Sequence, residues 1–183
     1  MPSSCRVFIA TSLDGFIARA DGSIDWLDAA NAVVPPGEDM GYAAFMSTID
    51  ALVMGRSTFE TAMSFAAWPY GATPVVVLSA QLASLPGTAP STVSLHRGGP
   101  AALVADLAAK GLKHLYIDGG LAIQSFLALH LIDELTITTI PVLLGSGKPL
   151  FGALPADVRL QHLSTRAYEF GFVQTTYRVV HDT

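Results

Sequence analysis

Residues 51–58 read ALVMGRST, an apolar run that ends at Gly55 and is followed at once by an arginine and two hydroxyl residues. The apolar run is typical of a buried strand over 51–54. The residues after the glycine predict one or two helical turns over 57–63. This junction places exposed backbone N–H groups, hydroxyls and a guanidinium at the end of a strand.

A second stretch repeats the arrangement further along the chain. Residues 115–120 read LYIDGG, which predicts a strand over 114–117, a turn at the two glycines and a helix over 121–129. Strands that lead into helices predict crossover connections and a mostly parallel sheet.

The remaining apolar runs extend this pattern. Glu38 and Asp39 precede apolar residues at helical spacing, and acidic residues stabilise a helix N-terminus, so another helix is expected there. Two alternating stretches near the end are typical of an antiparallel strand pair. The chain of 183 residues is therefore expected to form one α/β domain over 1–183, with a mostly parallel central sheet and an antiparallel C-terminal strand pair. The predicted ranges are strands 6–11, 74–79, 92–96, 134–144, 160–167 and 172–180, and a helix 100–110.

Composition excludes several classes of protein. Hydrophobic residues make up 51% and charged residues 14% of the chain, which excludes intrinsic disorder. The formal net charge of −5, with scattered basic residues, argues against a nucleic-acid partner. Residues 61–96 carry no charge, but prolines and glycines interrupt them too often for a membrane span. No apolar signal segment precedes the first strand, so we expect a cytoplasmic protein without a membrane partner.

The same scarcity of charge predicts that a second copy of the chain covers part of the surface. We expect a homodimer, and the long uncharged part of strand 134–144 makes it the favoured shared edge. Cys5 is the single cysteine, so neither a disulfide framework nor a cysteine zinc site is expected. The five histidines are dispersed, and no metal is expected.

Three strand ends carry residues suited to a nucleotide. They are Gly55 to Thr58, Gly119 with Gly120, and Ser79 at the end of PVVVLS. Helix N-termini and glycines bind phosphate, and in open α/β sheets ligands lie beyond the carboxyl ends of strands. Each piece also has a plainer interpretation as a turn or a helix cap. The stretch GSGK at 145–148 is not a Walker A loop, because Val142 stands where that motif needs glycine.

The order of these motifs resembles the dihydrofolate reductase-like superfamily, in particular the branch of the riboflavin-biosynthesis reductase (the C-terminal domain of a bifunctional deaminase-reductase). The resemblance covers nearly the whole chain, and it implies a three-layer fold and an NADPH-dependent reductase. The segments that carry it are FIATSLDGFIA (8–18), SIDWL (23–27), GEDMGY (37–42), ALVMGRSTFE (51–60), PVVVLS (74–79), LYIDGG (115–120) and DELTITTIPVLLGSGKPLF (133–151).

The resemblance implies a role for each matching cofactor residue. Ala10 and Ile17 would flank the nicotinamide. Arg56 gives a physical reason to prefer NADPH, because a guanidinium can pair with the additional 2′-phosphate. The residues expected to hold phosphates, adenosine and pyrophosphate are Gly55, Arg56, Ser57 and Thr58, then Leu78 and Ser79, then Gly119, Gly120, Leu121 and Ala122.

Four residues are candidates on the substrate side. The resemblance makes Asp39 the expected proton donor, with Glu38 as its rival, although both could simply stabilise a helix N-terminus. Trp26 would cover the substrate pocket or pack in the core. Asp118 stands where the riboflavin-type reductases have an acid that faces substrate.

The expected substrate is a small heterocycle, with pyrimidine favoured over pteridine. The nearest activity is that of 5-amino-6-(5-phosphoribosylamino)uracil reductase. A ribose phosphate would need basic residues nearby, and Arg19 and Lys148 are the available ones. Two alternatives stay open: a dihydrofolate (pteridine) reductase, and a non-catalytic nucleotide-binding dimeric scaffold.

Overall fold

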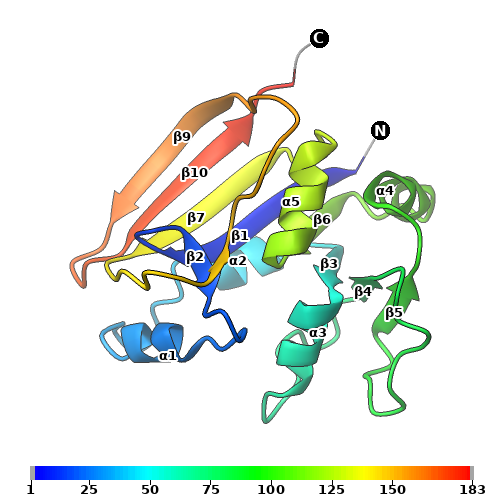
Figure 1. The fold of residues 1–183 in the computed structure, drawn as a ribbon, viewed down its shortest axis with the longest axis horizontal. Coiled ribbons are helices and arrows are strands. Elements are labelled where there is room, and N and C mark those ends of the chain that lie inside the picture. Colours follow the sequence, from blue (N-terminus) through cyan, green and yellow to red (C-terminus); the bar gives the residue numbers. More distant parts are fainter. Residues whose placement is uncertain (1–2, 182–183) are drawn as a thin grey trace.

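An eight-stranded sheet forms the centre of the computed structural model, which describes residues 3–181 (Figure 1). The strand order is β5-β4-β3-β6-β1-β7-β10-β9. Six neighbouring strands, from β5 to β7, run parallel, and β10 and β9 add an antiparallel pair, which confirms the predicted sheet. The strands are β1 (Ser4–Ser12), β3 (Ala51–Gly55), β4 (Val75–Leu78), β5 (Val93–His96), β6 (His114–Asp118), β7 (Glu134–Ile140), β9 (Leu160–Ala167) and β10 (Val173–Val179).

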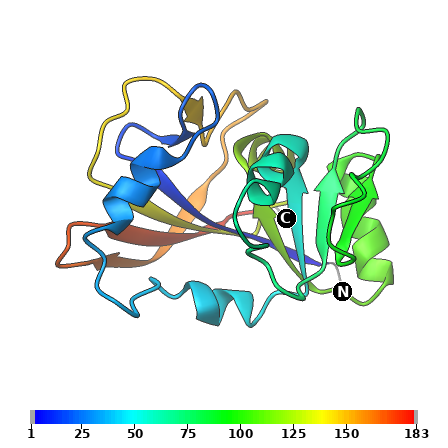
Figure 2. The same cartoon turned by 90° about the horizontal axis from the view of Figure 1, so that it is seen from below.

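Helices cover both faces of the parallel part, because its strands are apolar on both sides. Leu103, Leu107 and Phe126 pack on one face. Phe59 and the partly buried Phe45 pack on the other, and Figure 2 shows α2 in cyan below the strands. This arrangement gives three layers. The helices are α1 (Asp25–Asn31), α2 (Tyr42–Met46), α3 (Arg56–Met63), α4 (Pro100–Ala109) and α5 (Gly120–Ala128).

Three expectations need correction. The strand predicted over 134–144 ends at Ile140, because Pro141 has no N–H with which to continue the ladder. That strand, β7, pairs with β1 on one side and β10 on the other, so it is not an edge that a second copy could share. The helix expected after Glu38 spans only Tyr42–Met46, and helix α1 was not predicted.

Two short strands form a separate antiparallel sheet beside the main one. β2 (Phe16–Ala18) pairs with β8 (Lys148–Pro149), joining the N-terminal turn to the long connection after β7. Asp14 supports this junction. Its carboxylate accepts hydrogen bonds from Ser12 Oγ (2.6 Å) and from the N–H groups of Leu144 and Gly145 (3.1 and 2.7 Å). None of the helices formed within residues 3–181 has the length and apolarity needed to cross a membrane.

Candidate active site

A large cavity of about 890 Å³ opens at the carboxyl ends of β3, β4 and β6. Polar and apolar residues from the main sheet, α3, α5 and the small β2–β8 sheet line it. All twelve residues expected to bind the cofactor lie in its wall, although they come from five separate parts of the chain. They are Ala10, Ile17, Gly55, Arg56, Ser57, Thr58, Leu78, Ser79, Gly119, Gly120, Leu121 and Ala122.

The N-termini of two helices meet in this wall. Gly55 caps α3 and Gly119 caps α5, and neither helix has a side chain that hydrogen-bonds to its first N–H groups. Gly119 has a φ of +88°, and a Cβ placed on it would overlap Thr58 Oγ1, so the two helix starts are in close contact. Uncapped N–H groups and the positive ends of two helix dipoles therefore face one cavity, an arrangement that favours bound phosphates.

Gly120 brings the small sheet against the start of α5. A Cβ on this glycine would lie 3.0 Å from Ile17 Cδ1 and 3.1 Å from the carbonyl oxygen of Pro149. Gln124 holds the same carbonyl through its Nε2 at 3.0 Å. Close approach of the two segments leaves no room for a side chain, so the backbone itself forms this part of the wall.

Asp118 brings a carboxyl group to the cavity at the end of β6. Its Oδ1 accepts a hydrogen bond from the N–H of Gly119 (2.8 Å), and its Oδ2 accepts one from Tyr70 Oη (3.4 Å). Burial, only partly offset by these hydrogen bonds, raises the pKa of Asp118 to about 6. Burial, and next the charge of Asp118, raise the pKa of Tyr42 to about 12. A carboxyl of this pKa can donate or accept a proton near neutral pH.

The other three substrate-side candidates lie outside the cavity wall. Asp39 accepts N–H groups of Gly41 (2.9 Å) and Ala43 (2.8 Å) at the start of α2, and these bonds lower its pKa. Glu38 accepts the N–H of Met40 (2.7 Å) and lies 3.5 Å from Arg166 Nη2.

Trp26, in α1, is buried in a hydrophobic cluster with Ile140, Tyr168 and Phe172. It packs there rather than in the cavity wall. The proton-donor role of Asp39 stays a prediction that this geometry does not favour.

Sequence reasoning missed several residues of the wall. Tyr70 comes from the charge-free loop after α3 and reaches Asp118, and Ile24, Leu27 and Phe65 add apolar surface. Tyr70 and Phe65 belong to no motif, and Ile24 and Leu27 lie in the SIDWL segment, where only Trp26 was singled out. The clustering of aromatic residues in the stretch from Phe65 to Tyr70 is the one signal that could have suggested a folded loop.

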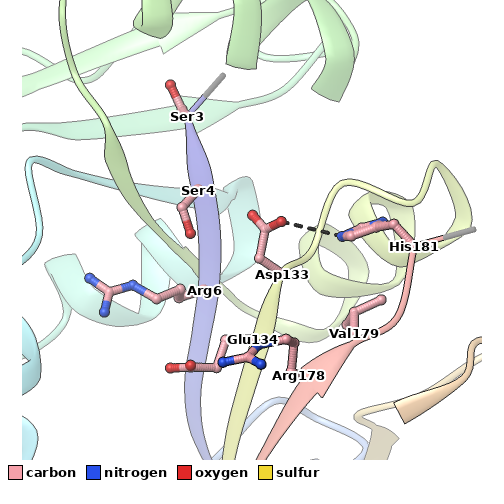
Figure 3. A pocket seen from close by; sticks show the side chains of 8 residues that line it. All are labelled: Ser3, Ser4, Arg6, Asp133, Glu134, Arg178, Val179 and His181. Carbon is pink, nitrogen blue, oxygen red and sulfur yellow. Dashed lines mark hydrogen bonds and ion pairs between the residues drawn. The ribbon is translucent and has the colours of Figure 1, made fainter. Parts of the chain in front are cut away.

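A second, smaller hollow of about 330 Å³ lies at the opposite end of the sheet, where β1 begins (Figure 3). Charges of both signs surround it. Asp133 accepts the N–H of Cys5 (2.8 Å) and lies 3.3 Å from His181 Nε2, and Arg6 donates to Thr48 Oγ1 (2.7 Å). The hollow is smaller and holds none of the residues expected to bind cofactor or substrate, so the larger cavity is the candidate active site.

Comparison with known proteins agrees with this geometry. The family model of the RibD C-terminal domain matches residues 4–173. The Bacillus subtilis (strain 168) protein YwjB is 36% identical over 165 residues, covering 88% of this chain and 90% of YwjB. The structure of a Shewanella sp. PV-4 protein assigned to riboflavin biosynthesis has a TM-score of 0.91 and 43% identity, and covers 97% of this chain and 99% of that protein.

The fold also extends to a more distant enzyme. Dihydrofolate reductase from Enterococcus faecalis, whose structure was solved with NADP(H), has a TM-score of 0.62 at 18% identity and covers 96% of both chains. This likeness shows that the three-layer architecture is dihydrofolate reductase-like. With the match over 4–173, the chain belongs to the RibD C-terminal domain family.

Proposed function

We propose that this protein is an NADPH-dependent reductase that transfers hydride to a C=N or C=O bond of a small heterocycle, with a pyrimidine favoured over a pteridine. One observation carries the proposal: two uncapped helix N-termini meet at Gly119 and Thr58 in a cavity that also holds the carboxyl of Asp118. The paired helix N-termini suit the phosphates of a dinucleotide, and the carboxyl of Asp118 suits proton transfer. Family membership supports an oxidoreductase.

The residues present fit a nicotinamide dinucleotide. Gly119 and Gly120 leave bare backbone where Cβ atoms would collide with neighbouring residues, and the starts of α3 and α5 offer N–H donors. Arg56 lies in the wall and is half-exposed, with its Nε 3.3 Å from Glu60 Oε1, so its guanidinium remains close to the cavity mouth for a 2′-phosphate.

A bound nicotinamide supplies the hydride, and thus both electrons of the reduction. The chain supplies the proton and the orientation. We place the transferred proton on Asp118, from which it passes to the nitrogen or oxygen of the reduced bond. Tyr70 holds the carboxyl in position through Oδ2. Ile17 on β2, whose side chain closes against the start of α5, keeps water from that side of the cavity.

Thermal shift with NADPH and with NADH at equal concentration tests the cofactor. Ligand at about 100 times its Kd stabilises a protein by about 2.7 kcal/mol. For a chain of this length we expect NADPH to raise Tm by roughly 5–11 °C and NADH to raise it less. Arg56→Ala should remove the difference between the two cofactors.

Arg19→Ala is the matched control, because Arg19 is an arginine ion-paired to Asp25 (2.6 Å) outside the cavity wall. It should keep the preference for NADPH. If neither cofactor changes Tm, the reductase proposal fails and the nucleotide-binding scaffold loses its support as well. If both cofactors bind equally, Arg56 does not select the 2′-phosphate, but the cavity remains the proposed cofactor site.

We also propose a homodimer, now through β9 and β10 rather than β7. All eight residues of β9 are exposed, and β9 is a free edge of the sheet. Leu160, Leu163 and Val173 expose apolar side chains there, which favours a covered surface. Sedimentation at micromolar concentration should give a dimer, and Leu163→Asp should give a monomer. A monomeric unmodified chain at that concentration would contradict the proposal.

A further inference from the structure

Few cations surround the candidate active site. The chain has ten lysines and arginines, all within residues 3–181, and two of them, Arg56 and Lys148, line the cavity. The third charged residue of the wall is Asp118, which is acidic. The cavity therefore offers only two positive side chains to all the phosphates that could enter it.

Other cations that could have reached a substrate are held elsewhere. Arg19, which the sequence suggested for a ribose phosphate, has its Nε 2.6 Å from Asp25 Oδ1 and does not line the cavity. Arg166 pairs with Glu38 at 3.5 Å and lies over the ring of Tyr168, with Cζ 4.3 Å from the ring centre. Arg6 and Arg178 lie at the far end of the sheet, around the small hollow of Figure 3.

The two cations of the wall lie on different segments. Arg56 is the first residue of α3, so its charge stands where that helix offers free N–H groups. Lys148 lies in β8, and its Nζ lies 3.0 Å from the position that a Cβ on Gly22 would take. A cation and N–H donors thus occur together at the start of α3, where the proposed dinucleotide would carry phosphate.

Asp118 brings a negative charge to the same wall, directly before the N-cap of α5. It accepts a hydrogen bond from Tyr70, and the described wall offers no lysine or arginine besides Arg56 and Lys148. A substrate phosphate beside Asp118 would face its carboxylate, which disfavours binding when that carboxylate is ionised. A ring or amino N–H, in contrast, would donate a hydrogen bond to Asp118.

We infer, on the basis of the proposed function, that the substrate is an uncharged heterocycle without a phosphate group, which presents an N–H to Asp118. NADPH carries three phosphate groups, which already outnumber the two cations of the described wall, so no further basic side chain remains for a phosphoribosyl substrate. The chain would then act on a ligand that differs from 5-amino-6-(5-phosphoribosylamino)uracil by lacking the phosphate, or on another neutral ring of similar size.

Calorimetry on the NADP⁺-saturated protein tests this inference. The ligands are 5-amino-6-ribosylaminouracil and its 5′-phosphate, handled without oxygen. We expect the unphosphorylated compound to bind at least as tightly as the phosphate. Tighter binding of the phosphate, beyond experimental error, overturns the inference, and a tenfold preference would correspond to about 1.4 kcal/mol.

If neither uracil compound binds, inorganic phosphate provides the decisive probe. Added at millimolar concentration to the NADP⁺-saturated protein, it should leave Tm unchanged, whereas a saturable rise in Tm reveals a vacant phosphate site and overturns the inference. A preceding titration of the free protein with NADP⁺ tests the proposed function separately from the inference about the substrate phosphate. Failure of NADP⁺ to bind defeats the proposed function, and this inference with it, before any substrate is added.

Lys148→Ala distinguishes the two possible uses of the lysine. If Lys148 serves the cofactor, the variant weakens NADPH binding several-fold and leaves the ratio of the two uracil affinities unchanged. A selective loss of affinity for the phosphorylated compound would instead place a substrate phosphate at Lys148 and overturn the inference. Lys113 lies outside the cavity wall, so Lys113→Ala is the matched control. It should change neither the NADPH affinity nor the ratio of the two uracil affinities.

Discussion

Asp118→Asn should reduce turnover by roughly 100-fold or more, the usual contribution of a positioned general acid. An amide keeps the size of the side chain, and its oxygen can still accept a hydrogen bond from the N–H of Gly119. It has no acidic proton that it could transfer to the substrate at neutral pH. Steady-state NADPH oxidation, with the heterocycle that a substrate screen identifies, measures the loss. Because the acid must be protonated and its pKa is raised to about 6, the turnover of the unmodified enzyme should decline as pH rises above that value.

The same substitution should stabilise the fold at alkaline pH. Burial raises the pKa of Asp118 from 3.8 to about 6, so between these values the folded chain holds a proton that the unfolded chain releases. The stability that this proton confers is fully present below the pKa that Asp118 has in the unfolded chain. It is lost as pH rises through the pKa that Asp118 has in the folded chain. At about pH 8 the ionised carboxyl therefore disfavours folding, by about 2–3 kcal/mol at most, and Asn removes this cost.

Thermal unfolding at two pH values checks this expectation. Tm of Asp118→Asn should exceed that of the unmodified chain by up to roughly 4–12 °C at about pH 8. The difference should vanish near pH 4, where the folded carboxyl is already neutral. A variant that is less stable at both pH values would show that Asp118 is an ordinary structural acid.

Asp39 gives the opposite expectation, and so separates the two carboxylates. Its hydrogen bonds from Gly41 and Ala43 lower its pKa, so they stabilise the fold at neutral pH and are lost as pH falls through the folded pKa. Asp39→Asn should reduce stability at neutral pH and change turnover little. Loss of turnover in Asp39→Asn, with activity retained in Asp118→Asn, would restore the assignment that the family resemblance implied.

The sequence predicted the parts of this molecule that local rules determine. Gly55 and Ser79 follow apolar runs directly, and Gly119 follows one after Asp118. Parallel strands bring such ends to one edge of the sheet, so the twelve residues expected to bind the cofactor line one cavity. The acid was harder to assign. Asp39 precedes a helix of only five residues and accepts N–H groups at its start, and the length of so short a helix depends on packing rather than on pattern.

Tyr70 and the position of β7 escaped prediction for a related reason. Tyr70 belongs to a loop without periodicity, and its contact with Asp118 joins residues 48 positions apart. The alternation of β7 is compatible with an edge or an interior strand, and only the pairing of β10 against it makes it interior. Long-range pairing of this kind is not encoded in any local motif.

Gly119→Ala should reduce NADPH affinity by about 100-fold or more, because it disturbs both helix N-termini at once. Gly119 has φ +88° and ψ 140°, a conformation that is nearly restricted to glycine and costs other residues about 1–3 kcal/mol. The added Cβ would also overlap Thr58 Oγ1, so α3 and α5 must separate where their N–H groups converge. Fluorescence titration with NADPH measures the affinity, and thermal unfolding measures the accompanying loss of stability.

Gly111→Ala separates backbone strain from damage to the site. Gly111 has φ +81°, so alanine is strained there too, but nothing lies within 4 Å of its Cβ position, and Gly111 does not line the cavity. Gly111→Ala should lose stability and keep its NADPH affinity. Adding Thr58→Ala to Gly119→Ala removes the overlapping oxygen and should recover part of the stability. Unchanged NADPH affinity in Gly119→Ala would mean that the dinucleotide does not bind between these two helices.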